Sequence, residues 1–179
     1  MTVSDVLIVS VTAAAVFFDF HMRRIPNWLI LFGLAAGLIL HSYQGFDQLS
    51  YSVLGLAAGI AILLIPFALG WIGAGDVKLF GVVGALLGLN WLPRVFFYSA
   101  VVAGLIAVGY VLVGRFNSRF FADTWADWKI ALLTLGRVLP EPITIRASKG
   151  AHSVPWGVAF GIGTIWAYYL DPHGSWAGF

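Results

Sequence analysis

Six apolar stretches, separated by short polar segments, dominate the chain. They lie at residues 3–20, 28–40, 51–72, 77–92, 95–114 and 154–170. A membrane-spanning helix needs about 20 mostly apolar residues, so the pattern predicts an all-α bundle of six transmembrane helices joined mostly by short loops. The second stretch is short for a span. We therefore expect its helix to continue into the polar residues after Leu40, or the bilayer to thin around it.

Composition places the chain in the membrane class. Of its 179 residues, 60% are hydrophobic and 10% are charged, and the mean hydropathy is +0.92, whereas globular domains carry about 25% charged residues. We expect one membrane-embedded domain over residues 1–179. The basic residues are scattered rather than clustered in a stripe, which argues against nucleic-acid binding.

Cysteine and histidine usage narrows the chemistry further. The chain has no Cys, which excludes disulfides, thiolate zinc sites and a Cys nucleophile. Its four His residues are dispersed, and no pair has a metal-ligand spacing. We therefore predict neither a metal nor another cofactor.

Basic residues predict the orientation in the membrane. With the N-terminus outside, nine of the ten Lys and Arg residues fall on the inner side and only Arg94 falls outside. The expected outer loop, residues 41–50, contains no Lys or Arg. Both termini are thus predicted outside. The first residues lack the basic region of a signal peptide, so the first apolar stretch is expected to remain in the mature protein.

A longer inner loop is predicted at residues 115–153. Within it, residues 123–133 have apolar positions at helical spacing flanked by Trp and Lys, which is typical of an amphipathic helix lying on the inner leaflet. A separate soluble subdomain is the alternative, although about 39 residues is marginal for an independent core.

Small residues recur at four-residue spacing within the apolar stretches. Such pairs let helices approach closely in lipid, so we interpret them as packing positions of a compact bundle. The pairs are Gly33/Gly37, Gly55/Gly59, Gly84/Gly88 and Gly157/Gly161.

Two carboxylates lie at the predicted inner edge of the membrane. Asp19 closes the first apolar stretch, before a turn indicated by Pro26 and by Asn27 as a helix N-cap. Asp76 follows Gly73-Ala74-Gly75, and the glycines would let another chain lie against this segment. Ionisable residues at a membrane boundary indicate function.

Structural roles remain open for each Asp taken alone. Asp19 has the spacing to pair with Arg23 one helical turn later. Asp76 has the position to cap the fourth helix.

Together, the two carboxylates suit hydrolysis. At about 4 Å they repel by roughly 4 kcal/mol at an effective dielectric of 20, so one would hold a proton while the other is ionised. The ionised member can take a proton from water while the protonated member polarises a peptide carbonyl. Because the pair titrates as one unit, neither Asp is assigned its own role.

These motifs resemble the type IV prepilin peptidase family, particularly the small enzymes of tight-adherence (Flp-type) pilus systems. The resemblance rests on Asp19 with Arg23-Arg24-Ile25-Pro26-Asn27, on Gly73-Ala74-Gly75-Asp76-Val77-Lys78-Leu79, and on the segment 154–159, Val-Pro-Trp-Gly-Val-Ala, before the last span. It extends over nearly the whole chain.

The resemblance implies an aspartic protease of the GxGD class in the bacterial inner membrane. Its substrates would be prepilins or pseudopilins, each with a short basic leader and a hydrophobic helix, cleaved at the cytoplasmic membrane face. Asp19 and Asp76 would be the catalytic pair and Gly73 and Gly75 the backbone frame, with Lys78 a neighbouring motif residue of underived role. Larger members also methylate the product and carry a zinc region with cysteines; we expect that region to be absent here and do not expect methylation.

Two other classes compete with the protease. A small proton-coupled transporter would relay protons through both carboxylates, but no convincing internal repeat is found and both Asp lie at one edge rather than at mid-membrane. A non-catalytic assembly subunit of a secretion system would use both Asp only in structural pairs. Carboxamide substitutions separate these readings. The oligomeric state is left open.

Overall fold

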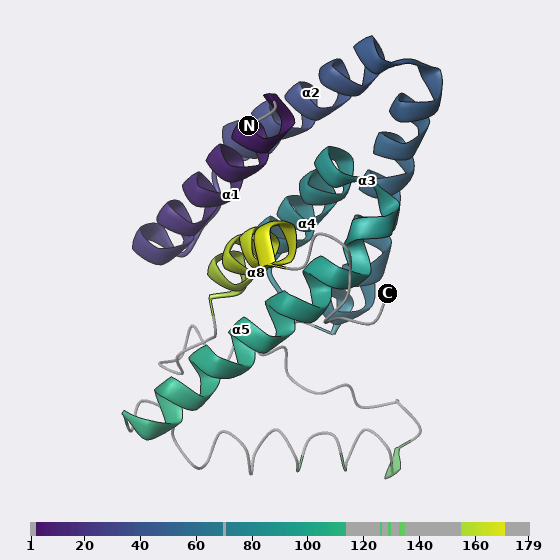
Figure 1. Cartoon of the computed structure of the whole chain (residues 1–179). Coiled ribbons are helices and arrows are strands. Elements are labelled where there is room, and N and C mark those ends of the chain that lie inside the picture. The colour runs from purple at the N-terminus through teal and green to yellow at the C-terminus, as the bar shows by residue number, and fades with distance from the viewer. Residues whose placement is uncertain are drawn as a thin grey trace.

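The protein is described by a computed structural model covering residues 3–69, 71–113, 126, 129, 133–134 and 155–170. Within these ranges it is helical (Figure 1). The helices, in chain order, are α1 (Val3–Met22), α2 (Asn27–Gln44), α3 (Phe46–Ala68), α4 (Ala74–Leu87), the short 3-10 helix η1 (Leu89–Trp91), α5 (Leu92–Leu112) and α8 (Trp156–Leu170).

Each predicted apolar stretch coincides with one of the six α-helices in the described part of the chain, which confirms the all-α prediction. Three helical segments are long and apolar enough to cross a membrane: Val3–Met22, Phe46–Ala68 and Leu89–Leu112. Large apolar side chains point outward over much of the bundle, as expected where lipid rather than water surrounds a protein. The chain is thus a membrane protein, and the full set of six spans remains a prediction.

The connection between α2 and α3 is shorter than predicted. In place of an outer loop at 41–50, α2 continues to Gln44, α3 begins at Phe46, and only Gly45 separates them. Gly45 has φ +118, a conformation that side-chain-bearing residues rarely adopt, so a glycine is required at this turn. The expected continuation of the second helix beyond Leu40 is confirmed.

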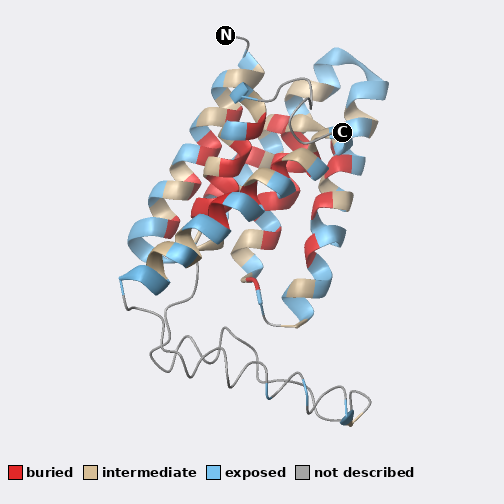
Figure 2. Cartoon of the chain, turned by 60° about the horizontal axis from the view of Figure 1, so that its bottom comes forward, coloured by how far each residue is buried: buried red, intermediate tan, exposed pale blue. Residues whose placement is uncertain are grey.

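Helix α4 forms the centre of the bundle. Nine of its 14 residues are buried, and it contacts α1, α2, α3, α5 and α8. Buried residues gather along the middle of the bundle, while exposed ones lie on its outer surface (Figure 2). The largest buried side chains include Phe80 of α4 and Phe160 of α8, whose ring centroids are 5.0 Å apart.

The predicted packing role of the small residues is confirmed at most positions. A Cβ atom at Gly55 would overlap the backbone carbonyl of Gly84, and one at Gly84 would overlap that of Gly55, so α3 and α4 touch backbone to backbone. Gly33, on α2, lies close to the side chain of Val82. A Cβ atom added at Gly33 would lie 2.7 Å from Cγ1 of Val82. Gly88 differs, since it ends α4 with φ +87.

The predicted inner loop at 115–153 lies almost entirely outside the described residues, as does most of its expected amphipathic helix at 123–133.

Candidate active site

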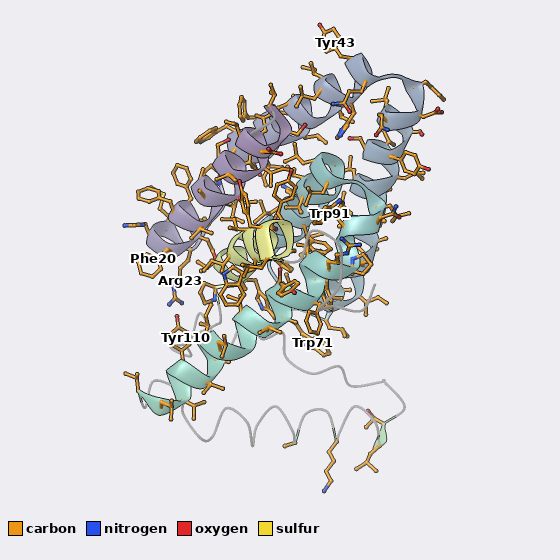
Figure 3. All side chains as sticks on the ribbon, in the orientation of Figure 1. Phe20, Arg23, Tyr43, Trp71, Trp91 and Tyr110 are labelled. Atoms are coloured by element: carbon orange, nitrogen blue, oxygen red, sulfur yellow. The ribbon has the colours of Figure 1, made fainter. Side chains whose placement is uncertain are left out.

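A cleft opens at the end of the bundle where α1 ends and α2 and α4 begin. Its volume is about 370 Å³. Figure 3 marks this end by Arg23 and the opposite end by Tyr43. The cleft brings together every site residue predicted from sequence. It is also lined by basic residues and turn residues from the connection between α1 and α2. Its lining is Asp19, Arg23, Arg24, Ile25, Asn27, Gly73, Ala74, Gly75, Asp76 and Lys78.

Asp19 lies in the last turn of α1 and is buried, with 7% of its surface exposed. Its Oδ2 atom accepts a hydrogen bond from the backbone N–H of Val158, at 3.0 Å. Val158 is the third residue of α8, so the carboxylate lies at a helix N-terminus, where free N–H groups favour negative charge. The hydrogen-bond partner is therefore not Arg23, which nevertheless lies close enough to attract the carboxylate electrostatically.

The chain leaves α1 at Arg23. This residue has φ 50, in the left-handed region that is uncommon for residues other than glycine. Its N–H donates to the carbonyl oxygen of Asp19, at 2.9 Å, and so closes the last helical turn. The left-handed residue turns the chain away from α1 toward α2, beside the cleft.

Asp76 is the third residue of α4, not the N-cap that its sequence position also allowed. Gly73 is the N-cap, and its backbone N–H donates to Oδ2 of Asp76 at 3.2 Å. This is the reciprocal half of a capping box. The carboxyl group of Asp76 is thus oriented by the start of its own helix, whereas Asp19 is bound by the start of another.

The glycines of the second motif matter because they lack a side chain, not because they adopt unusual backbone angles. Gly73 has φ −78 and ψ 155, an extended conformation open to any residue. A Cβ atom on Gly73 would lie 3.2 Å from Oδ2 of Asp76, and one on Gly75 would lie 3.6 Å from Cβ of Ile25. A side chain at either position would narrow the cleft beside Asp76.

Lys78 links the two sequence motifs. Its Nζ donates to Oδ1 of Asn27 at 3.2 Å, which joins α4 to the first residue of α2. Asn27 was predicted as the N-cap of this helix, but α2 begins with it, and Pro26 takes the cap position. The Asn27 side chain is therefore used to hold α4 rather than to cap α2.

Two contributors to the site were missed by sequence reasoning. Val158 belongs to a segment quoted only for its resemblance, and Gly157 was predicted only as a helix-packing position. A Cβ atom on Gly157 would lie 2.8 Å from Cγ of Asp19, so this glycine is required for the close approach of α8. Hydropathy cannot reveal the hydrogen bond between Val158 and Asp19, because these residues are 139 positions apart in sequence.

The arrangement is suited to acid–base chemistry on a substrate that enters the cleft. Two carboxyl groups line it together with three cationic side chains, those of Arg23, Arg24 and Lys78. Among the described residues, no group of three or more His, Cys, Asp or Glu side chains is placed to hold a metal ion.

Comparison with known proteins finds one family and relatives that share a single description. The Type IV leader peptidase family matches residues 6–108, a range that contains both Asp motifs. A prepilin leader peptidase/N-methyltransferase of Bacillus subtilis is 34% identical over 119 residues, which are 65% of this chain and 46% of the relative. One of Neisseria gonorrhoeae is 30% identical over 129 residues, or 68% and 44% of the two chains.

The relative in Aeromonas hydrophila is 31% identical over 122 residues, covering 63% of this chain and 41% of its own. The chain thus spans less than half the length of these curated relatives. No solved structure matches it. Because the family match covers more than half of the sequence, the chain belongs to the type IV leader peptidase family.

Proposed function

We propose that the chain is an aspartic endopeptidase that removes the short basic leader of prepilins or pseudopilins, with Asp19 and Asp76 as its catalytic pair. The observation that carries the proposal is their meeting in one cleft at the end of the bundle, although they are 57 positions apart in sequence. Family membership supports it, since the matched relatives are named prepilin leader peptidases.

The proposed reaction needs only water and the two carboxyl groups. The ionised member takes a proton from water as the water oxygen bonds to the peptide carbonyl carbon, and the protonated member gives its proton to the carbonyl oxygen. When the tetrahedral intermediate collapses, the C–N bond breaks and the leaving nitrogen receives the proton taken from water. The intermediate's hydroxyl returns the other proton to its donor, which restores the pair.

Supporting residues have distinct roles in this proposal. Gly73 and Gly75 keep the cleft open beside Asp76, because side chains there would meet the carboxylate or Ile25. Lys78 holds the two motifs together through Asn27. The cleft faces the cytoplasm and both termini lie outside, as the distribution of basic residues predicts.

The substrate is a single apolar helix with a basic leader. The glycine pairs of the bundle are not free to receive that helix, because neighbouring helices already fill the space beside Gly33, Gly55, Gly84 and Gly161. We place the substrate helix in the surrounding lipid instead. Its leader enters the cleft from the membrane edge, and anionic lipid rather than the basic inner face attracts it.

The experiment is coexpression of the chain with a prepilin, followed by gel shift and mass measurement of the product. Wild type should remove the leader, while Asp19→Asn and Asp76→Asn, each still present in the membrane, should not. Asp47→Asn is the matched control, since Asp47 lies in the first turn of α3 away from the cleft. Equal cleavage by all four proteins would refute the proposed role of the pair.

A further inference from the structure

The first turn of α8 contacts the carboxylate of Asp19 but not that of Asp76. Val158 donates its N–H to Oδ2 of Asp19 at 3.0 Å. Asp76 receives one backbone hydrogen bond, from Gly73 at 3.2 Å. Each carboxylate of the proposed pair therefore accepts one backbone N–H, and the donor to Asp19 comes from a helix far away in the sequence.

Hydrogen bonds donated by backbone N–H groups stabilise a carboxylate more than a neutral carboxylic acid. A helix N-terminus adds the partial positive charge of its free N–H groups. Asp19 has both, through the N–H of Val158 at the start of α8. Because the pair titrates as one unit, removing this donor should raise the pH at which the pair ionises.

On these grounds we infer that Gly157 and Val158 are positioning residues, which hold the Asp19 carboxylate in the cleft and favour the ionised form of the pair. The inference rests on the proposed function and adds the start of α8 to its site.

Sterics make Gly157 specific to this role. A Cβ atom there would lie 2.8 Å from both Cγ and Oδ2 of Asp19, and 2.9 Å from its Cβ. Alanine at this position therefore forces α8 and the carboxylate apart and breaks the amide contact. Gly161, one turn later on α8, is more crowded still, but its Cβ atom would meet Val16 and the carbonyl of Thr12. Gly161→Ala thus disturbs the same helix pair without touching Asp19.

The test measures kcat/KM for prepilin cleavage against pH, using the purified full-length chain in lipid. Gly157→Ala should lower kcat/KM by about 100-fold or more. The acidic limb of its profile should also move to higher pH by about one unit, because the negative charge at Asp19 has lost its amide donor. Gly161→Ala should leave the position of that limb unchanged. The other charged groups lining the cleft, Asp76, Arg23, Arg24 and Lys78, are the same in both variants, and α8 itself carries none.

Val158→Pro provides a second variant, in which the ring Cδ atom takes the place of the hydrogen that Val158 donates to Asp19. Proline removes the N–H itself, and it is tolerated in the first turn of a helix because these N–H groups lack intrahelical partners. We expect the same shift of the acidic limb as for Gly157→Ala. Thermal unfolding of each variant provides the stability reference.

The outcomes separate the inference from the proposed function. If wild type cleaves and both variants retain its pH profile, with kcat/KM lowered equally at all pH or not at all, the role of α8 is structural and the inference is overturned. If wild type does not cleave a prepilin at all, the proposed function fails, and the inference fails with it.

Discussion

At the scale of single residues, both candidate catalytic groups lie at the start of a helix. Asp76 is the third residue of α4 and accepts the N–H of its own N-cap. Asp19 belongs to the end of α1 but accepts the N–H of the third residue of α8. The first N–H groups of a helix can stabilise a buried carboxylate without a Lys or Arg side chain paired to it. The carboxyl group therefore remains available to a substrate.

The sequence allowed the two carboxylates and the motif residues around Asp76 to be predicted together, but not the contact of α8 with Asp19. Asp19 and Asp76 each close or open an apolar stretch on the same side, and hydropathy detects such positions directly. The donor to Asp19 could not be predicted, because every residue except proline has a backbone N–H and the residue type does not indicate which one donates. Only the glycine at 157 hints at the contact, and many glycines in this chain serve helix packing instead.

We predict a weak coupling between Lys78 and Asn27. Their hydrogen bond is exposed, so its net contribution to the free energy of unfolding should be about 0.5–1 kcal/mol. The measurement is a double-mutant cycle of thermal unfolding with Lys78→Met, Asn27→Leu and the double variant. Strictly additive effects would show that the contact contributes nothing to holding the motifs together.

At the scale of helices, α4 is fixed by backbone contact with α3, and its position sets that of Asp76. The four-residue spacing of Gly55 and Gly84 with their partners indicated close packing in advance, but which helix meets which was not readable from one sequence. The end of α2 was predicted only in part. The length of a membrane span indicated a continuation beyond Leu40, but the apolar pattern could not place the end of the helix at Gln44.

We predict that Gly84→Ala destabilises the bundle by about 1–3 kcal/mol or more, since its methyl group would overlap the backbone of Gly55. Thermal unfolding in detergent or lipid measures the effect. Gly104→Ala on α5 is the matched control, because no atom lies within 4 Å of its added Cβ. That control should be neutral or gain up to about 1 kcal/mol from helix propensity. Equal stability of both variants would contradict the backbone contact between α3 and α4.

At the scale of the whole molecule, the two ends of the bundle differ in chemistry. One end holds the carboxylate cleft, with Arg23, Arg24 and Lys78. At the other end, the hydroxyl of Tyr168 donates to Asp5 and its ring packs on Trp91 at 5.4 Å, while Arg94 lies over Trp91 at 5.1 Å. The balance of basic residues assigned the cleft end to the cytoplasm, which the fold alone does not decide.

The absence of Cys makes that orientation directly testable. A single cysteine at the exposed position Tyr43, beside the α2–α3 turn, should react with a membrane-impermeant maleimide in intact cells. One at Met22, at the cleft end, should react only after the membrane is opened. Labelling of Met22→Cys alone in intact cells would reverse the proposed topology and place the cleft outside.

The central claim is that Asp19 and Asp76 act as one catalytic unit in leader cleavage. The most direct measurement is the rate of leader release from a purified prepilin by the purified chain in lipid, with Asp19→Asn, Asp76→Asn and the double variant. Each single change should reduce kcat by about 100-fold to 10,000-fold, and the double variant should be no slower than the slower single one. Single variants that cleave at the wild-type rate would contradict the account.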